Sequence, residues 1–308
     1  MGCTVNSSEV EAAQPPHREP LPIIPRRYWG RWAAAVLILL VTAAILYGLS
    51  RAKIAYADVP RFFVYPVILQ GLWHTIVLAL ASQACGTVLG LLIAIMRVSR
   101  NPVARQTARV YIWTFRGVPV LLQLLIWYNL GLAFTQIGIP GVFSISTNTL
   151  ITPFVAALFG LGLNESAYMA EIVRAGFNSI DKGQIEAAHS IGMSPAKTLR
   201  RVILPQAMRV IIPPTGNDFI NMLKETSLAS VISYVELIQA ANNISSHNLE
   251  VMETLLSAAA WYMILVTLAS IGQQYIERAF ATDTAGRRRV PLTHTMGKAL
   301  RMLPRFTR

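Results

Sequence analysis

Six long apolar runs, separated by shorter polar segments that hold most of the charge, dominate the chain. The runs cover residues 33–49, 67–96, 118–134, 150–173, 213–237 and 255–275. At about 1.5 Å per helical residue, each one spans or nearly spans a hydrocarbon core of about 30 Å. A half-polar helix over 102–115 is expected to extend the third run backwards. The pattern predicts an all-α polytopic membrane helix bundle with six crossings.

Composition supports a membrane protein and excludes several other classes. The chain is 54% hydrophobic and 14% charged, whereas a soluble domain is about 25% charged. Two cysteines, Cys3 and Cys85, are too few for a disulfide framework, and the five histidines lack metal-ligand spacing. The net charge of +12 collects in short loops between apolar runs. We therefore expect a lipid membrane as the environment, with no metal site and no nucleic-acid partner.

The distribution of basic residues predicts the orientation. With six crossings, the loops on one side hold 23 Lys and Arg residues and those on the other side hold three. Cytoplasmic loops carry the excess of positive charge. Both termini are therefore predicted in the cytoplasm, with the first run retained as a membrane span.

The polar segment between the fourth and fifth runs predicts two short helices, with a glycine that ends the first one. Residues 184–191 are fair helix formers, and Gly192 can supply the left-handed residue that ends a helix. Ser194 is a good N-cap, and Pro195 suits the first position of a second helix, which is expected to end at Pro205.

This segment resembles the EAA motif of ABC-type importer permeases. The residues that match it are Glu186, Ala187, Ala188, Gly192, Leu204 and Pro205, with Val202 where the motif has Ile. Segments 99–102, 115–119, 164–174 and 223–228 are similar to motifs of the polar amino acid subfamily (His/Glu/Gln/Arg/opine type), in the same order. The resemblance covers about residues 69–277.

The resemblance implies a type I, MetI-like permease fold in a bacterial cytoplasmic (inner) membrane, with an added N-terminal span. It implies that the EAA helix docks on a cytoplasmic ABC ATPase dimer. It further implies a second permease chain, identical or homologous, and an extracytoplasmic solute-binding protein. The expected organisation is a disordered tail (1–28), the extra span with its external loop (29–61), the permease domain (62–280) with its coupling loop (181–205), and a basic tail (281–308).

The chain lacks sequence motifs for ATP hydrolysis. No G-x-x-x-x-G-K-[ST] occurs, and Ala299 follows the only Gly-Lys pair. Neither G-x-S-x-G nor H-E-x-x-H is present. We therefore expect no catalytic residue, no enzyme activity and no cofactor on this chain, with ATP and Mg bound by the partner ATPase.

Polar and charged side chains within the fourth and fifth runs are candidates for the substrate pathway, because ionisable groups at membrane depth are costly and usually functional. They are Asn164, Glu165, Ser166, Tyr168, Asp218, Asn221, Lys224 and Glu225. Lys224 fits either a substrate contact or a lock between helices, and Glu171 and Arg174 fit a structural ion pair. The excess of acids weakly favours a polar or cationic amino acid over an acidic one.

Other functions compete with an amino-acid importer. A secondary transporter also uses intramembrane acids, but it has no use for a docking helix. A membrane enzyme would need a catalytic constellation that the sequence lacks. Within the importer class, another small polar solute, such as an opine or an organic cation, is the alternative.

Overall fold

The computed structural model describes residues 29–139 and 143–280, so the expected tails 1–28 and 281–308 lie outside the described residues. The chain separates into two units, residues 1–53 and 54–308. In the first unit, α1 (Trp29–Ser50) is a single helix that includes the first predicted span. Its length and composition suffice to cross a membrane.

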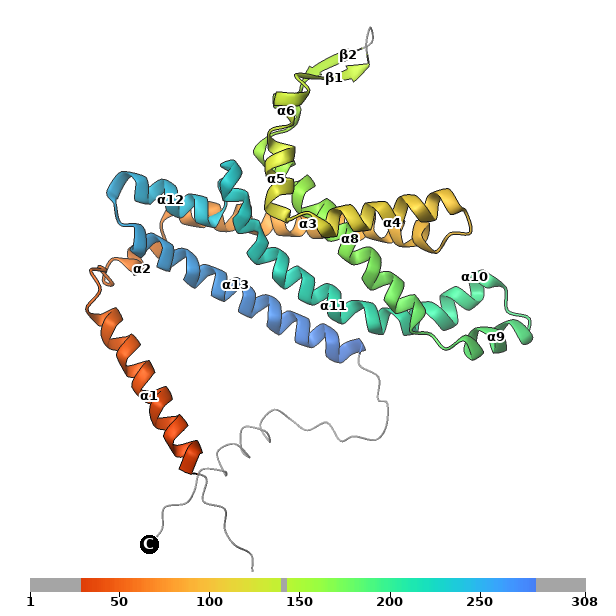
Figure 1. The fold of residues 1–308 in the computed structure, drawn as a ribbon, viewed down its shortest axis with the longest axis horizontal. Coiled ribbons are helices and arrows are strands. Elements are labelled where there is room, and N and C mark those ends of the chain that lie inside the picture. The colour runs from red at the N-terminus through yellow and green to blue at the C-terminus, as the bar shows by residue number, and fades with distance from the viewer. Residues whose placement is uncertain (1–28, 140–142, 281–308) are drawn as a thin grey trace, which may run out of the picture. The chain divides into compact units, whose positions relative to one another are not determined.

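The second unit is a bundle of long helices with short connecting elements, shown in Figure 1. Its helices are α2 (Val59–Phe63), α3 (Pro66–Val98), α4 (Pro102–Gly117), α5 (Val120–Tyr128), α6 (Leu130–Ala133), α7 (Thr147–Leu150), α8 (Pro153–Asn178), α9 (Lys182–Ser190), α10 (Pro195–Thr198), α11 (Leu204–Glu225), α12 (Leu237–Asn248) and α13 (Val251–Phe280). A hairpin of β1 (Gln136–Ile139) and β2 (Phe143–Ser146) lies between α6 and α7. The predicted all-α bundle is confirmed, apart from this small hairpin, which the sequence pattern did not indicate.

The pair α3 and α8 forms the most extensive helix contact in the unit. Small residues allow the two backbones to approach closely. A Cβ atom at Gly86 would overlap the side chain of Glu165, and one at Gly90 would overlap Met169. The glycines of α3 therefore leave the space that a carboxyl side chain of α8 occupies.

The third predicted span is broken, which corrects the expectation of one helix extended backwards. Helices α4 and α5 meet at an angle of 100° (Figure 1). The side chain of Gln123 donates two hydrogen bonds across the bend, to the carbonyls of Phe115 and Val118 (both 2.9 Å). These bonds satisfy backbone groups that the break removes from the helical pattern.

The fifth predicted span, 213–237, is displaced towards the N-terminus. Helix α11 covers Leu204–Glu225 and contains Pro213 and Pro214 in its interior. Prolines are tolerated inside membrane helices where neighbouring groups satisfy the backbone. Here Gln273 of α13 donates a hydrogen bond to the carbonyl of Pro213 (3.0 Å). This bond ties α11 to α13 at the prolines. Helix α11 runs through Pro213 and Pro214 instead of starting at them, so the predicted start was wrong.

The C-terminal end of α11 is set by hydroxyl side chains that compete for its last carbonyls. Thr226 donates to the carbonyl of Leu223 (2.9 Å), and Ser227 donates to that of Lys224 (2.6 Å). A 3₁₀ helix over 226–232 follows instead of a continued span.

Candidate functional site

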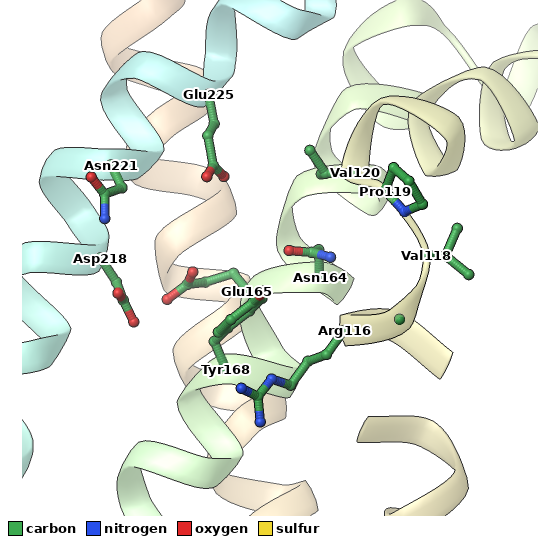
Figure 2. Close-up of a pocket in the computed structure, with 11 residues that line it drawn as sticks. Arg116, Val118, Pro119, Val120, Asn164, Glu165, Tyr168, Asp218, Asn221 and Glu225 are labelled. Atoms are coloured by element: carbon green, nitrogen blue, oxygen red, sulfur yellow. The ribbon is translucent and has the colours of Figure 1, made fainter. Parts of the chain in front are cut away.

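A cavity of about 430 Å³ lies where the bend between α4 and α5 meets α8 and α11. Its lining residues are Arg116, Gly117, Val118, Pro119, Val120, Asn164, Glu165, Tyr168, Asp218, Asn221 and Glu225. Figure 2 shows Asp218, Asn221 and Glu225 along one side of α11, across from Glu165 and Tyr168 of α8. The lining holds three carboxylates and one guanidinium, so its formal charge is negative.

Glu165 is the most buried of the three carboxylates. Its residue is 6% exposed, and it occupies the space beside Gly86 on α3. Gln83 donates one hydrogen bond to its Oε1 (3.0 Å). A buried carboxylate usually has several partners, so Glu165 retains acceptor capacity towards the cavity.

Asp218 presents an oxygen that has no partner among the residues the structure describes. Its Oδ2 is buried and accepts no hydrogen bond. Leaving such an atom unpaired costs about 1–3 kcal/mol, and more for a charged group. An oxygen of this kind beside a cavity is suited to a ligand that donates hydrogen bonds.

Arg116 enters the cavity from the bend. Asn164 donates a hydrogen bond to the carbonyl of Phe115 (2.7 Å), which fixes the end of α4 against α8. The guanidinium of Arg116 lies 4.8 Å from the ring centre of Tyr168, a cation–π geometry. Figure 2 shows the two side chains together below Glu165.

A second cavity of about 400 Å³ shares the Arg116–Tyr168 pair as part of its wall. It is also lined by Glu171, Ile172, Arg174, Ala175, Val210 and Pro214. Arg174 donates two hydrogen bonds to Oε2 of Glu171 (2.8 and 2.6 Å), so the predicted ion pair is confirmed.

Six of the eight residues predicted for the substrate pathway line the first cavity: Asn164, Glu165, Tyr168, Asp218, Asn221 and Glu225. Ser166 does not line it, because its hydroxyl faces Tyr111 (2.7 Å) in the bundle interior. Lys224 does not line it either. It is exposed in the last turn of α11 and forms no salt bridge among the described residues, so both alternatives for Lys224, a substrate contact and a lock between helices, stay predictions.

Arg116 is the residue of the site that sequence reasoning missed. Segment 115–119 resembles a motif of the subfamily, but in the hydrophobic pattern Arg116 is one more basic residue of a polar loop. The 100° bend, which turns it into the cavity, has no signal in the hydrophobic pattern apart from the Gly-Val-Pro sequence that follows.

The predicted coupling segment has the expected local structure around Gly192. Its φ is +77°, its N–H donates to the carbonyl of His189 (2.9 Å), and the N–H of Met193 donates to that of Ala188 (3.0 Å). These two bonds define a Schellman motif. The side chain of Asp181 caps the other end of α9 by accepting from the N–H of Gly183 (2.6 Å).

The remainder of this segment differs from expectation. Ser194 precedes α10 but makes no side-chain cap bond. The chain does not end a helix at Pro205. Instead it passes through a π-helical turn over 199–203 directly into α11. Leu204 and Pro205 thus open a long helix, and Pro205, which has no N–H to donate, directly follows the π-helical turn.

The exposed surface of α9 includes Glu186 and Ala187, while Ala188 is buried. Ile191, next to the turn, is 78% exposed. Gln206 of α11 donates a hydrogen bond to Gln184 (2.6 Å), which ties α9 to the long helix. Within the described part of the chain, no group of three His, Cys, Asp or Glu residues could hold a metal ion.

Comparison with known proteins gives consistent matches. The family described as "Binding-protein-dependent transport system inner membrane component" matches residues 86–282. The arginine transport system permease protein ArgU of Corynebacterium glutamicum is 42% identical over 272 residues, which cover 87% of this chain and 84% of that protein.

Solved structures agree with these matches. The crystal structure of an amino acid ABC transporter with histidines has a chain that aligns with a TM-score of 0.65 and 35% identity, covering 74% of this chain and all of that chain. A chain of the MetNI methionine ABC transporter aligns with a TM-score of 0.56 at 18% identity, covering 70% of this chain and 97% of its own. The second match supports the MetI-like fold alone.

Proposed function

Because this chain belongs to the family of inner membrane components of binding-protein-dependent transport systems, we propose that its acidic cavity carries a cationic amino acid, with arginine as the first candidate. The chain is an amino-acid permease subunit of an ABC importer, a multi-pass protein of the inner membrane. In such importers the ATPase and the solute-binding protein are separate subunits.

The charge of the first cavity is the observation that carries the choice of substrate. A zwitterionic amino acid needs one carboxylate for its ammonium group and donors for its own carboxylate. Glu165 and Asp218 suit the ammonium group, while Arg116 and Asn221 supply donors. Glu225 then remains for a positively charged side chain. The named substrate of the 42% identical relative, arginine, has this chemistry.

We place the coupling to the ATPase at α9 and the start of α11. Glu186, Ala187 and Ala188 lie on a helix held at both ends, by the Asp181 cap and by the turn at Gly192. An exposed short helix with fixed ends suits a rigid contact with a cleft. In this proposal the partner is a dimer of ABC ATPases that binds ATP and Mg, and this chain holds no cofactor.

Orientation and assembly are part of the same proposal. The coupling segment and both termini lie in the cytoplasm, as the basic residues indicate. A second permease chain, identical or homologous, covers the polar side of the bundle. Support comes from Arg116 and Tyr168, which line the cavity yet are exposed in the single chain, an arrangement that lipid would penalise.

The test is ATP-driven uptake by proteoliposomes that contain the permease, its ATPase and its binding protein. We expect labelled arginine to accumulate, with unlabelled lysine competing better than glutamine or glutamate. Glu165→Gln and Asp218→Asn should each lower arginine uptake about tenfold or more, since each removes a charge-assisted contact. Asp58→Asn is the matched control, because Asp58 makes no side-chain cap bond and lies outside the cavity. Uptake of glutamine without competition by arginine would reject the proposed substrate.

A further inference from the structure

The two cavities differ in the sign of the charge that lines them. The first holds three carboxylates and the guanidinium of Arg116. In the second, Glu171 is neutralised by its ion pair with Arg174, which leaves Arg116 as the uncompensated charge. The local charge therefore changes from negative to positive at the wall that the two cavities share.

That wall is the stacked pair of Arg116 and Tyr168, the two residues that line both cavities. Along both α8 and α11, the second cavity lies nearer to the coupling segment than the first cavity does. On α8 the second cavity reaches Ala175, three residues from the C-terminal end. On α11 it is lined by Val210 and Pro214, which are closer to the N-terminal end than Asp218.

We propose that Arg116, held on the ring of Tyr168, is a selectivity residue that keeps cytoplasmic cations out of the acidic cavity. This inference rests on the proposed function for the direction of transport. An acidic cavity open to the cytoplasm would otherwise attract inorganic cations and polyamines. An arginine at the boundary between the two cavities opposes the approach of cations by its charge.

The same pair can admit an amino acid that leaves the first cavity. A carboxylate forms charge-assisted, often bidentate hydrogen bonds with a guanidinium, whereas the ring of Tyr168 offers a weaker cation–π contact. The carboxylate of the substrate can thus draw Arg116 away from the ring. Cations that carry no carboxylate have no group to do this, so the barrier discriminates by chemical class.

Cysteine accessibility measures this barrier without requiring transport. In the intact transporter, Cys3 and Cys85 are replaced by serine, and Asn221→Cys reports on the acidic cavity. Inside-out vesicles are treated with a cationic methanethiosulfonate (trimethylammonium-ethyl) or an anionic one (sulfonatoethyl). The measured quantity is the modification rate with the cationic reagent divided by that with the anionic reagent. Ala175→Cys reports on the second cavity in the same way.

We expect Arg116→Gln to raise the cation-to-anion ratio at position 221 by on the order of a hundredfold. The loss of one charge about 10 Å from the reporter, at an effective dielectric constant near 20, changes the rate of each reagent by about tenfold or more, and in opposite directions. Arg116→Lys should keep the ratio of the parent. Tyr168→Leu should raise it, whereas Tyr168→Phe, which retains a ring, should not. Arg109→Gln is the matched control, because Arg109 is an exposed arginine of the same helix that lines neither cavity.

An unchanged ratio in Arg116→Gln would overturn the barrier, and equal ratios in the two Tyr168 variants would overturn the role of the ring. If arginine is not the substrate, the unmodified protein will show no ATP-driven arginine uptake, which is a separate result. The accessibility ratio would still report on Arg116 in that case.

Discussion

Replacing Gly192 by valine tests whether the turn between α9 and α10 couples ATP hydrolysis to transport. The residue has a φ of +77°, and a Cβ atom built there meets nothing within 4 Å. The substitution therefore introduces no steric clash with neighbours. Its cost comes only from the left-handed backbone conformation, which a β-branched residue adopts least readily.

The size of the effect follows from that conformation. A left-handed residue other than glycine costs about 1–2 kcal/mol, which lowers the population of the native turn by a factor of about 5–30 relative to its alternatives. The two hydrogen bonds donated by Gly192 and Met193 are lost with the turn. Asparagine tolerates this region of φ, so Gly192→Asn is the matched control.

Four measurements are made together in proteoliposomes and membranes: membrane level, ATPase copurification, stimulation of ATP hydrolysis by loaded binding protein, and arginine uptake. We expect Gly192→Val to insert normally but to reduce stimulation and uptake about 5–30-fold, in line with the loss of the native turn. Gly192→Asn should stay close to the unmodified protein.

Normal uptake by Gly192→Val at a normal membrane level would refute the coupling role of this segment. A different result, in which asparagine impairs coupling as much as valine does, would refute the backbone argument. The position would then matter through contact with the ATPase instead of through φ.

Three further predictions concern the bundle. Gly86→Ala should force Glu165 out of its place and destabilise the bundle by about 1–3 kcal/mol through overpacking, which thermal unfolding in detergent measures. Gly272→Ala is the control and should be close to neutral, because a Cβ atom there meets nothing within 4 Å. Gln123→Leu should remove the side-chain donor of the Val118 carbonyl at about 1–3 kcal/mol, whereas the Phe115 carbonyl keeps Asn164 as a donor. Thermal stability and arginine uptake should both fall, and an unaltered melting temperature would contradict the role of this side chain. A reporter fused after Thr147 should lie outside the cell, and a reporter fused after Ala196 should lie in the cytoplasm. An external signal from the fusion after Ala196 would reject the orientation.

Helix positions were predictable where a single apolar stretch runs from one loop to the next. The helices α1, α3 and α13 lie where the hydrophobic runs are, because length and hydropathy alone decide such segments. The left-handed turn at Gly192 was predictable as well, since a glycine after a helical segment has a specific conformational use.

The break between α4 and α5 and the limits of α11 were not predictable in this way. The break depends on Gln123, whose partners are backbone carbonyls that no periodicity reveals. The C-terminal limit of α11 depends on hydroxyl groups such as that of Thr226, which bond backbone carbonyls. The contact of Gln273 with Pro213 in the middle of the helix comes from a residue nearly fifty positions beyond its end. Sequence alone therefore located six residues of the cavity and missed Arg116, while Ser166 and Lys224 lie outside its lining.

The continuity of α11 has a mechanical consequence. One helix of 22 residues, about 33 Å long, carries Leu204 and Pro205 at one end and Asp218, Asn221 and Glu225 towards the other. The hydrogen bond from Gln273 holds it at Pro213, near its middle. A rod held at its midpoint is a lever, so a push on the end next to α9 would swing the carboxylate-bearing end in the opposite direction. A tilt of about 10° would displace each end by about 3 Å.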